Sequence, residues 1–266
     1  MQNLSVSEQP KRLTKKNESA VKVIKIIEAM SRRRGPVRLQ DIARDSGLPT
    51  STTIRFLNSL IDLGYVQQQR ETARYALTLK LCRVAGDISQ NTSYRDVVRP
   101  YMEELTERLS ESSCMAVMEG VKALYVDVVD APDQLLKTLQ RIGKSAPLHS
   151  TGVGKCLLLG LASRERRSLL EQTPLVRLTE HTHASMESLE RDLELSRKRG
   201  YALDDEECEL GVRCVAAPVS DHSGNIVASI SISGPSSRIT PKRIDQIASD
   251  LIETARVVSR ALGAPV

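Results

Sequence analysis

The sequence has no apolar run long enough to cross a membrane. Such a span needs about 18 consecutive apolar residues, and none occurs among the 266 residues of the chain. The stretch 1–16 is polar and basic, and it lacks the apolar core of a secretory signal. We therefore expect a cytoplasmic protein without a membrane partner.

Cysteines are few and show no pairing pattern. They are Cys82, Cys114, Cys156, Cys208 and Cys214. Their number is odd and they are scattered, so in a cytoplasmic chain they should be reduced thiols rather than a disulfide framework. Cys208, Cys214 and His149 have ligand atoms suited to zinc, but paired-ligand spacing is missing. We therefore expect neither a metal nor a cofactor.

Positive charge is confined to the first third of the chain. The composition, 40% hydrophobic and 27% charged, is that of a globular protein, and the length suits two domains. Residues 1–80 carry 15 Lys and Arg against 7 Asp and Glu, whereas the remainder carries 23 against 26. This asymmetry indicates a polyanion partner for the first domain alone. A solvated basic tail is the alternative, because residues 11–16 supply four of the positive charges.

An N-terminal arm precedes the first predicted helix. Residues 1–18 are polar and without period, so we expect them to be disordered. Ser19 should then cap a helix that stops at Gly35 and Pro36. The stripe of apolar residues between these limits predicts that the helix packs on a core.

Two further helices with a glycine turn between them follow. Apolar residues at helical spacing predict a short helix that ends at Gly47, where a left-handed backbone favours glycine. Thr50 or Ser51 should cap the next helix, over residues 52–63. The small side chain of Ala43 lets the two helices approach closely. This combination is the signature of a helix-turn-helix.

A predicted hairpin completes a winged helix-turn-helix over residues 19–78. Residues 65–77 have the pattern of two short strands around a polar turn. Glycine turn, capped second helix and hairpin occur in this order within the basic third of the chain. Their convergence favours DNA binding over a purely structural helical domain.

We expect the second helix of the motif (52–63, the recognition helix) and the hairpin (65–77, the wing) to contact double-stranded DNA. Hydroxyl groups near the helix start suit phosphate, Arg55 can pair with guanine or phosphate, and Asn58 can bind adenine. Ile54 either touches a thymine methyl group or packs against the wing. The wing arginines either reach the DNA or are merely solvated. The expected contact residues are Arg38, Ser51, Thr52, Ile54, Arg55, Asn58, Arg70 and Arg74.

Residues 42–57, 63–66 and 75–77 together form a pattern that resembles the IclR family of bacterial transcription regulators. Further matches downstream extend the resemblance from about Ser19 to Gly263. It implies a sequence-specific DNA-binding regulator, which we predict to be a repressor. It also implies a homodimer or homotetramer that binds a palindromic operator.

The remaining chain divides into a connector and an α+β domain. Apolar residues from Leu77 to Ile88 keep helical spacing and predict a linker helix over residues 79–97, whose stripe could also join two subunits. We assign residues 98–266 to the second domain, in which Pro100 should open a helix. The further expected elements are a hairpin over 114–129, a strand over 135–140, helices over 154–161, 163–170 and 185–199, strands over 213–220 and 226–232, and a closing helix over 241–262. One sheet with helices gives an α+β class, and the resemblance implies a GAF-like effector-binding fold.

Residues 149–156 contain a glycine-rich turn that leads into a helix. The segment fails as a phosphate loop, because the first glycine and the final hydroxyl residue of that motif are missing. Its free backbone N–H groups at Gly152, Val153 and Gly154 are nevertheless suited to hold an anion. A tight turn without a ligand is the alternative.

Three small polar residues should share one face of the sheet. Ser231 and Ser233 alternate along one strand, and Cys214 stands near the start of its neighbour. Spacing alone favours hydrogen-bonded core residues, whereas the resemblance implies a pocket for a small organic-acid or sugar-acid effector. It adds Asp204, which must then accept from a ligand hydroxyl or a water, or be protonated. The implied effector-binding residues are Gly152, Val153, Asp204, Cys214, Ser231 and Ser233.

The alternative function is an enzyme that uses Cys214 as a nucleophile on a small substrate. A catalytic thiol needs a base, and no histidine stands in a local arrangement with Cys214. We therefore predict no catalytic residues.

Overall fold

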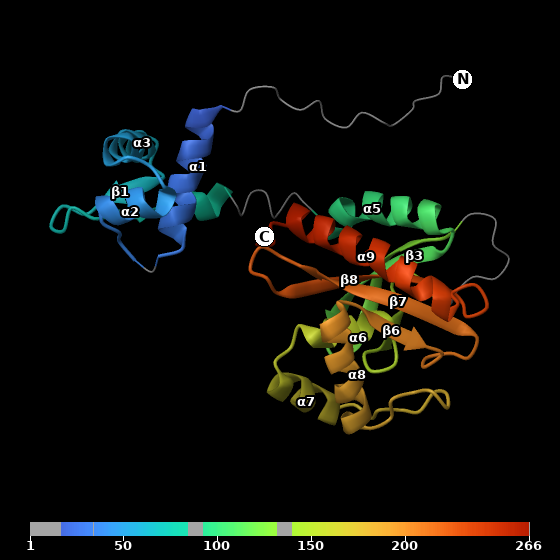
Figure 1. Ribbon diagram of the computed structural model, residues 1–266. Helices are drawn as coiled ribbons and strands as arrows, with labels where there is room; N and C mark the ends of the chain where they lie inside the picture. The colour runs from blue at the N-terminus through green and yellow to red at the C-terminus, as the bar shows by residue number, and fades with distance from the viewer. Residues whose placement is uncertain (1–16, 34, 85–92, 132–139, 266) are drawn as a thin grey trace, which may run out of the picture. The chain divides into compact units, whose positions relative to one another are not determined.

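The computed structural model describes residues 17–33, 35–84, 93–131 and 140–265 (Figure 1). The chain forms two compact units, Met1–Asn91 and Thr92–Val266. Each unit has hydrophobic core residues of its own. Among the described residues, no helix is both long enough and apolar enough to span a membrane.

The first unit is a winged helix-turn-helix, which confirms the prediction. Its elements are α1 (Glu18–Ser31), α2 (Leu39–Ser46), α3 (Thr50–Asp62), β1 (Val66–Gln68) and β2 (Tyr75–Leu77). The two strands pair antiparallel as the wing. Ile26 of α1, Ile42 of α2 and Leu57 of α3 are all fully buried in one core, so the three helices are held together by shared apolar contacts.

Gly47 makes the turn between α2 and α3. Its φ of 67° lies in the left-handed region, where a side chain is costly. Its N–H closes α2 on the carbonyl of Arg44. Buried Ala43 stands one turn before it. The turn therefore has the conformation that the sequence predicts.

Two predicted helix caps are wrong. Asn17 rather than Ser19 caps α1, because the Asn17 side chain accepts hydrogen bonds from the first-turn amides, including that of Ser19. Pro49 is the residue before α3, so Thr50 and Ser51 lie inside its first turn instead of capping it. Pro49 has φ −57° and ψ 144°, so its backbone is extended, and its side chain offers no oxygen to cap the helix.

The second unit is built on one six-stranded sheet. The strand order is β5-β4-β3-β8-β7-β6, and every neighbouring pair is antiparallel. The strands are β3 (Ser112–Glu119), β4 (Lys122–Val129), β5 (Ser145–Pro147), β6 (Ala202–Asp205), β7 (Val212–Ser220) and β8 (Ile226–Pro235). The helices are α5 (Tyr94–Leu109), α6 (Gly152–Leu159), α7 (Ser163–Glu171), α8 (Met186–Arg199) and α9 (Pro241–Ala261). The predicted α+β class is confirmed.

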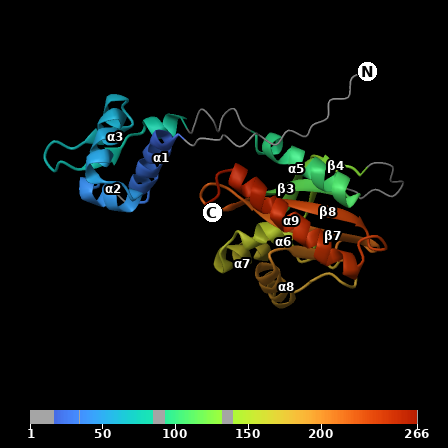
Figure 2. The same cartoon turned by 45° about the horizontal axis from the view of Figure 1, so that its top comes forward.

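Helices cover both faces of this sheet. Helices α5 and α9 lie on one face, and α6 with α8 on the other (Figure 1, Figure 2). Successive strand residues point to opposite faces, so Met115 and Ile230 pack with α5 and α9, whereas Cys114 and Ala216 pack with α6. The sheet thus separates two cores within one unit.

Pro100 does not open a helix, contrary to the prediction. It lies inside α5, which begins at Tyr94 under a cap from Ser93. The hydrogen bond lost at a helical proline is destabilising. Val98 and Met102, on either side of Pro100, are fully buried, and their packing offsets that loss.

Some predicted elements fall on residues that the structure does not describe. The strand over 135–140 lies almost wholly within 132–139, and Gln140 itself is not in a strand. Residues 80–84 are helical, as expected for the start of the linker helix, while 85–92 lie outside the described residues. The short strands β5 and β6 were not predicted, because three or four residues are too few to show a period.

Candidate functional site

Helix α3 presents an exposed polar face on the first unit. Ser51, Ile54, Arg55 and Asn58 are exposed, and Thr52 is half-buried. These five residues were all predicted to contact DNA, and they lie on one helix of the helix-turn-helix. The face combines hydroxyl, amide and guanidinium groups, which bind phosphates and base edges.

Arg55 is held against its own helix. Its guanidinium carbon lies 5.2 Å from the centroid of the Phe56 ring, a cation–π distance. The contact holds the guanidinium near the helix while the residue remains exposed. Outside α3, Arg38 is exposed at the start of α2, Arg70 is exposed on the wing, and Arg74 is half-buried there.

The second unit contains a cavity of about 670 Å³. Its wall consists of Tyr125, Gln140, Arg141, Lys144, Ser145, Ala146, Pro147, Thr151, Asp204, Cys208, Glu209, Val212 and Cys214. Tyr125, Asp204 and Cys214 are buried, whereas Arg141 and Lys144 are exposed. The cavity therefore has an uncharged thiol and phenol and one carboxyl group inside, with cations near the outside. A volume of this size suits a small organic ligand.

The structure brings Asp204, Cys214, Ser231 and Ser233 together on the neighbouring strands β6, β7 and β8. Cys214 is the strand partner of both Asp204 on β6 and Ser233 on β8. Only Asp204 and Cys214 belong to the cavity wall. Ser231 shares a 3.0 Å hydrogen bond with the thiol of Cys114. Its hydroxyl is thus engaged in the core, as spacing alone favours.

Ser233 is connected to the cavity through Gln140. The side-chain amide of Gln140, in the cavity wall, donates a 2.9 Å hydrogen bond to the Ser233 hydroxyl. The Ser233 oxygen accepts this bond, so its own proton can still be donated. Gln140 therefore connects this hydroxyl to the cavity, beside its strand partner Cys214.

The glycine turn forms the start of α6 and packs directly on the sheet. A Cβ on Gly152 would lie 3.2 Å from the sulfur of Cys214, so any larger residue here would push the helix start and the sheet apart by a few tenths of an ångström. The prediction of a free N–H at Gly154 is wrong, because Thr151 caps α6 and its hydroxyl accepts that N–H at 3.1 Å. Gly152 and Val153 are buried beside the cavity but are not part of its wall.

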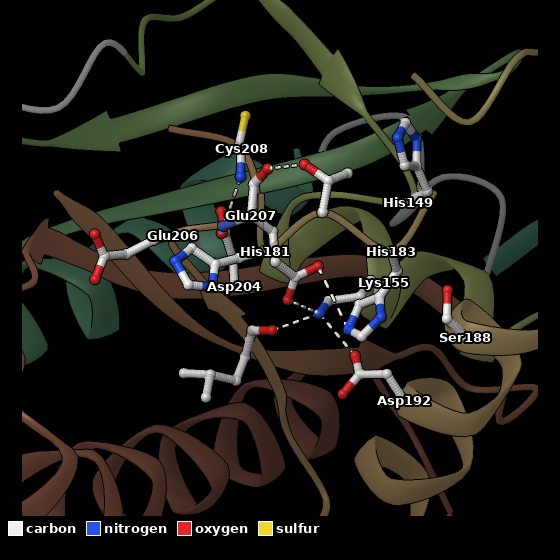
Figure 3. A network of polar contacts seen from close by, with 12 residues as sticks. His149, Lys155, His181, His183, Ser188, Asp192, Asp204, Glu206, Glu207 and Cys208 are labelled. Atoms are coloured by element: carbon white, nitrogen blue, oxygen red, sulfur yellow. Dashed lines mark hydrogen bonds and ion pairs between the residues drawn. The ribbon is translucent and has the colours of Figure 1, made fainter. Parts of the chain in front are cut away.

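Lys155 is the centre of a buried ionic network that the sequence analysis missed (Figure 3). Its side chain is completely buried. The ammonium donates to Asp192 of α8 at 2.7 Å, to Glu207 at 2.6 Å and to the carbonyl oxygen of Leu203 on β6 at 2.5 Å. Three oxygen partners satisfy the three N–H donors of the ammonium. The network ties α6, α8, β6 and the turn after β6 into one rigid body.

This network also positions Asp204. Asp204 Oδ1 accepts the backbone N–H groups of Glu207 at 2.8 Å and Cys208 at 3.3 Å, and the Glu207 side chain is held by Lys155. Burial is the main cause that raises the pKa of Asp204 to about 7, and the nearby Glu207 raises it further. At neutral pH the cavity carboxyl is therefore available as either a donor or an acceptor.

His183, Asp192 and Glu207 are the one group within the described residues with spacing suited to a metal ion. The Lys155 ammonium already bonds to both carboxylates of this group. A divalent cation would have to take these carboxylates from the ammonium and leave a buried positive charge without a partner. The arrangement thus fits an internal ion pair rather than a metal site.

Cys214 is poorly suited to act as a nucleophile. Burial is the largest of the causes that raise the pKa of its thiol above the ordinary value. A protonated thiol is a weak nucleophile. Two histidines are engaged by groups other than Cys214. The His149 ring nitrogen lies 3.0 Å from the carbonyl oxygen of Val176, and His183 faces Glu207.

Comparisons with known proteins place both units in one family. The model of the IclR helix-turn-helix domain matches residues 19–70, and the model of the bacterial transcriptional regulator IclR C-terminal domain matches residues 87–260. The transcriptional repressor IclR of Escherichia coli (strain K12) is 34% identical over 248 residues, covering 92% of this chain and 90% of that protein. The acetate operon repressor of Salmonella typhimurium is 34% identical with the same coverage. The crystal structure of Thermotoga maritima IclR is 29% identical, covers 92% of this chain and 99% of its own, and has a TM-score of 0.62.

Replacing Lys155 should destabilise the second unit strongly. In Lys155→Met the carboxylates of Asp192 and Glu207 lose their counter-charge while remaining largely buried, at a cost of about 3–5 kcal/mol. Lys198→Met removes an exposed lysine of α8 and should cost less than about 0.5 kcal/mol. Urea unfolding of the two variants measures the difference. Equal free energies of unfolding would show that the network contributes no stability.

Asp204→Asn should change how stability depends on pH. The pKa of Asp204 is about 7 in the folded chain, against an ordinary value of 3.8. A raised carboxyl pKa stabilises the folded state at low pH, and this contribution is lost as the pH rises through about 7. The wild type should therefore lose about 3 kcal/mol relative to Asp204→Asn between about pH 5 and pH 8, since about two pH units separate pH 5 from the folded pKa.

Thermal unfolding over this pH range measures the effect. Glu209→Gln, at an exposed carboxyl of the same cavity wall, is the control and should follow the wild-type profile. Parallel profiles for the wild type and Asp204→Asn would mean that Asp204 is ionised throughout.

Proposed function

The chain belongs to the IclR family of bacterial transcriptional regulators, and we propose that it is a repressor. Its affinity for an operator changes when a small organic acid fills its cavity. The chain is a DNA-binding regulator. One observation carries the proposal. The same chain joins an exposed recognition helix to a second unit with a cavity that contains a buried carboxyl group.

The first unit binds the operator through α3. Its N-terminal residues, Ser51 and Thr52, bind phosphate, while Arg55 and Asn58 bind base edges in the major groove. The stacking of Arg55 on Phe56 supports base recognition, since an ordered guanidinium loses less entropy on binding. The excess of positive charge in residues 1–80 supports non-specific attraction to the phosphate backbone.

We propose that the operator consists of two half-sites and that the regulator is a dimer or a tetramer of this chain. A single winged helix-turn-helix contacts few bases, so specific binding normally uses a palindrome. Residues Leu77, Leu81 and Val84 support a contact between subunits, since Val84 is 39% exposed at the described end of the connector. The predicted stripe continues to Ile88, outside the described residues.

The effector is a small organic acid or sugar acid. Asp204 and Cys214 line the cavity, and Ser233 is reached through Gln140. Protonated Asp204 can donate to a carboxylate, and ionised Asp204 can accept from a hydroxyl group, so hydroxy and oxo acids are both compatible.

No catalytic step is assigned to this chain. The buried thiol of Cys214 favours its protonated form, and cavity residues that only bind a ligand are enough for a regulator. A thermal-shift screen with pyruvate, glycolate, acetate and gluconate tests the sensing half. A ligand that binds the folded state raises the melting temperature, whereas turnover of any of these acids would contradict the assignment.

Arg55→Ala should weaken specific DNA binding by about 1–3 kcal/mol if Arg55 contacts a base. The operator is first enriched from random DNA with the wild-type chain, and fluorescence anisotropy then measures its affinity. Arg164→Ala removes the same charge from an exposed site on α7 and should leave operator affinity unchanged. If Arg55→Ala binds both enriched and random DNA like the wild type, Arg55 lies outside the interface.

Replacing both Ser231 and Ser233 with Ala should weaken the binding of an acid found in the screen. Ser231 is bonded to Cys114, whereas Ser233 is connected to the cavity through Gln140, so the expected loss is that of one hydrogen bond to a charged group. Such a bond contributes about 1.5–3 kcal/mol, and the Kd should rise at least tenfold. Ser229→Ala is the matched control, because Ser229 is buried on the same strand with its hydroxyl donated to the Ala217 carbonyl. An unchanged Kd in the double variant would assign these serines to the core alone.

A further inference from the structure

Strand β4 carries a bulge between the cavity and α5. Ala116 of β3 pairs with Tyr125, while its neighbour Met115 pairs with Asp127, so Val126 is an extra residue on β4. A bulge lets consecutive residues point to the same face and re-aims the side chains beyond it. Consequently Tyr125 and Asp127, two positions apart, lie on opposite faces of the sheet.

Tyr125 lies on the cavity side of the bulge. It belongs to the cavity wall and packs in the core formed with α6, with 6% of its surface exposed. No hydrogen-bond partner for its hydroxyl occurs among the described residues, so the group is available to a ligand. Its backbone pairs with Gly143 and Lys144 at 2.9 and 3.0 Å, which connects it to the exposed cations of the same wall.

Asp127 lies on the other side and anchors the start of α5. It is fully buried, yet two arginines of α5 converge on it. Arg99 donates to Asp127 Oδ1 at 2.7 Å, and Arg95 Nε lies 3.2 Å from Oδ2. If β4 alternated regularly through Val126, Tyr125 and Asp127 would share one face, and this carboxylate would point toward the cavity. The bulge is therefore the reason that α5 is attached to β4 by charge.

Helix α5 is the first element of the second unit. It begins at Tyr94, shortly after the boundary between the two units at Asn91 and Thr92. Arg95 and Arg99 occupy its first two turns. A displacement of Asp127 would therefore act on the end of α5 at which the connector to the DNA-binding unit arrives.

We propose that Tyr125, the Val126 bulge and Asp127 form a relay that transmits occupation of the cavity to the start of α5. Tyr125 is a ligand-contacting residue, and Asp127 is a positioning residue that acts through Arg95 and Arg99. A ligand that moves Tyr125 shifts β4 at the bulge, where the ladder is locally weaker, and thereby shifts the anchored arginines. This proposal rests on the proposed function in one respect: it requires that a ligand fills this cavity.

The first experiment tests the relay in the full-length chain without a ligand. Hydrogen exchange of the α5 amides at residues 97–99 should accelerate at least tenfold in Asp127→Asn. The matched control is Glu103→Gln, which removes the other carboxylate on Arg99, 2.9 Å away within α5 itself; it should change exchange less than twofold. Equal effects of the two variants would overturn the anchoring role of Asp127.

Tyr125→Trp adds bulk toward the cavity and stands in for an occupant. It should change exchange at residues 97–99 in the wild-type background and leave it unchanged when combined with Asp127→Asn. If the combined variant responds as strongly as Tyr125→Trp alone, the signal does not pass through Asp127. Thermal unfolding confirms that each variant is folded before it is compared.

The second experiment measures regulation with pyruvate as the probe. Operator affinity with and without saturating pyruvate gives a coupling ratio, which should fall to near 1 in Asp127→Asn while the Kd of pyruvate for the free chain changes less than threefold. Glu103→Gln should keep the wild-type ratio, and an unaltered ratio in Asp127→Asn would overturn the relay. Should the wild type respond to none of the screened acids, the proposed effector class fails, and the exchange experiments alone decide the relay.

Discussion

The second unit depends on one buried ammonium group. Lys155 is fully buried, which lysine almost never is without partners. Its bonds to Asp192, Glu207 and the Leu203 carbonyl replace the water that burial removes. Because these partners come from α8, the turn after β6 and β6 itself, one charge fixes how three segments meet α6. Breaking it would loosen the turn whose amides hold Asp204 in the cavity wall.

The sheet lets a single unit serve two tasks. The face covered by α6 and α8 holds the cavity, with Asp204, Cys214 and Tyr125 among its buried residues. The opposite face carries α5 and α9 on an apolar core. Side chains along a strand alternate between these two environments, so in a regular β4 Tyr125 and Asp127 would share one face. The bulge at Val126 puts them on opposite faces instead, so one short stretch of β4 contacts both the cavity and α5.

Long elements with a clear period could be predicted from the sequence, and local exceptions could not. Helix α9 and the helix-turn-helix around Gly47 follow from apolar spacing and from one left-handed glycine. Pro100 was misplaced because proline statistics favour a helix start, whereas buried neighbours on both sides hold α5 together through it. The residues at the N-cap positions, Asn17 and Pro49, could not be predicted because several residues near each helix start can occupy that position.

The candidate site shows the same division. Asp204 and Cys214 could be placed through the family resemblance, and the structure puts both in the cavity wall. The role of Lys155 could not be predicted, because its partners Asp192 and Glu207 are distant in sequence. Tyr125 carried no motif at all; it becomes visible only when β4 is folded beside the cavity.

The central claim is that one chain couples a ligand cavity to DNA binding, and calorimetry tests it most directly. The acid that raises the melting temperature most is titrated into the free protein and into the protein bound to its enriched operator. Coupling is reciprocal, so the two Kd values should differ by about 5–150-fold, the same factor by which the acid changes operator affinity. Identical Kd values for the free and the operator-bound protein would contradict the account.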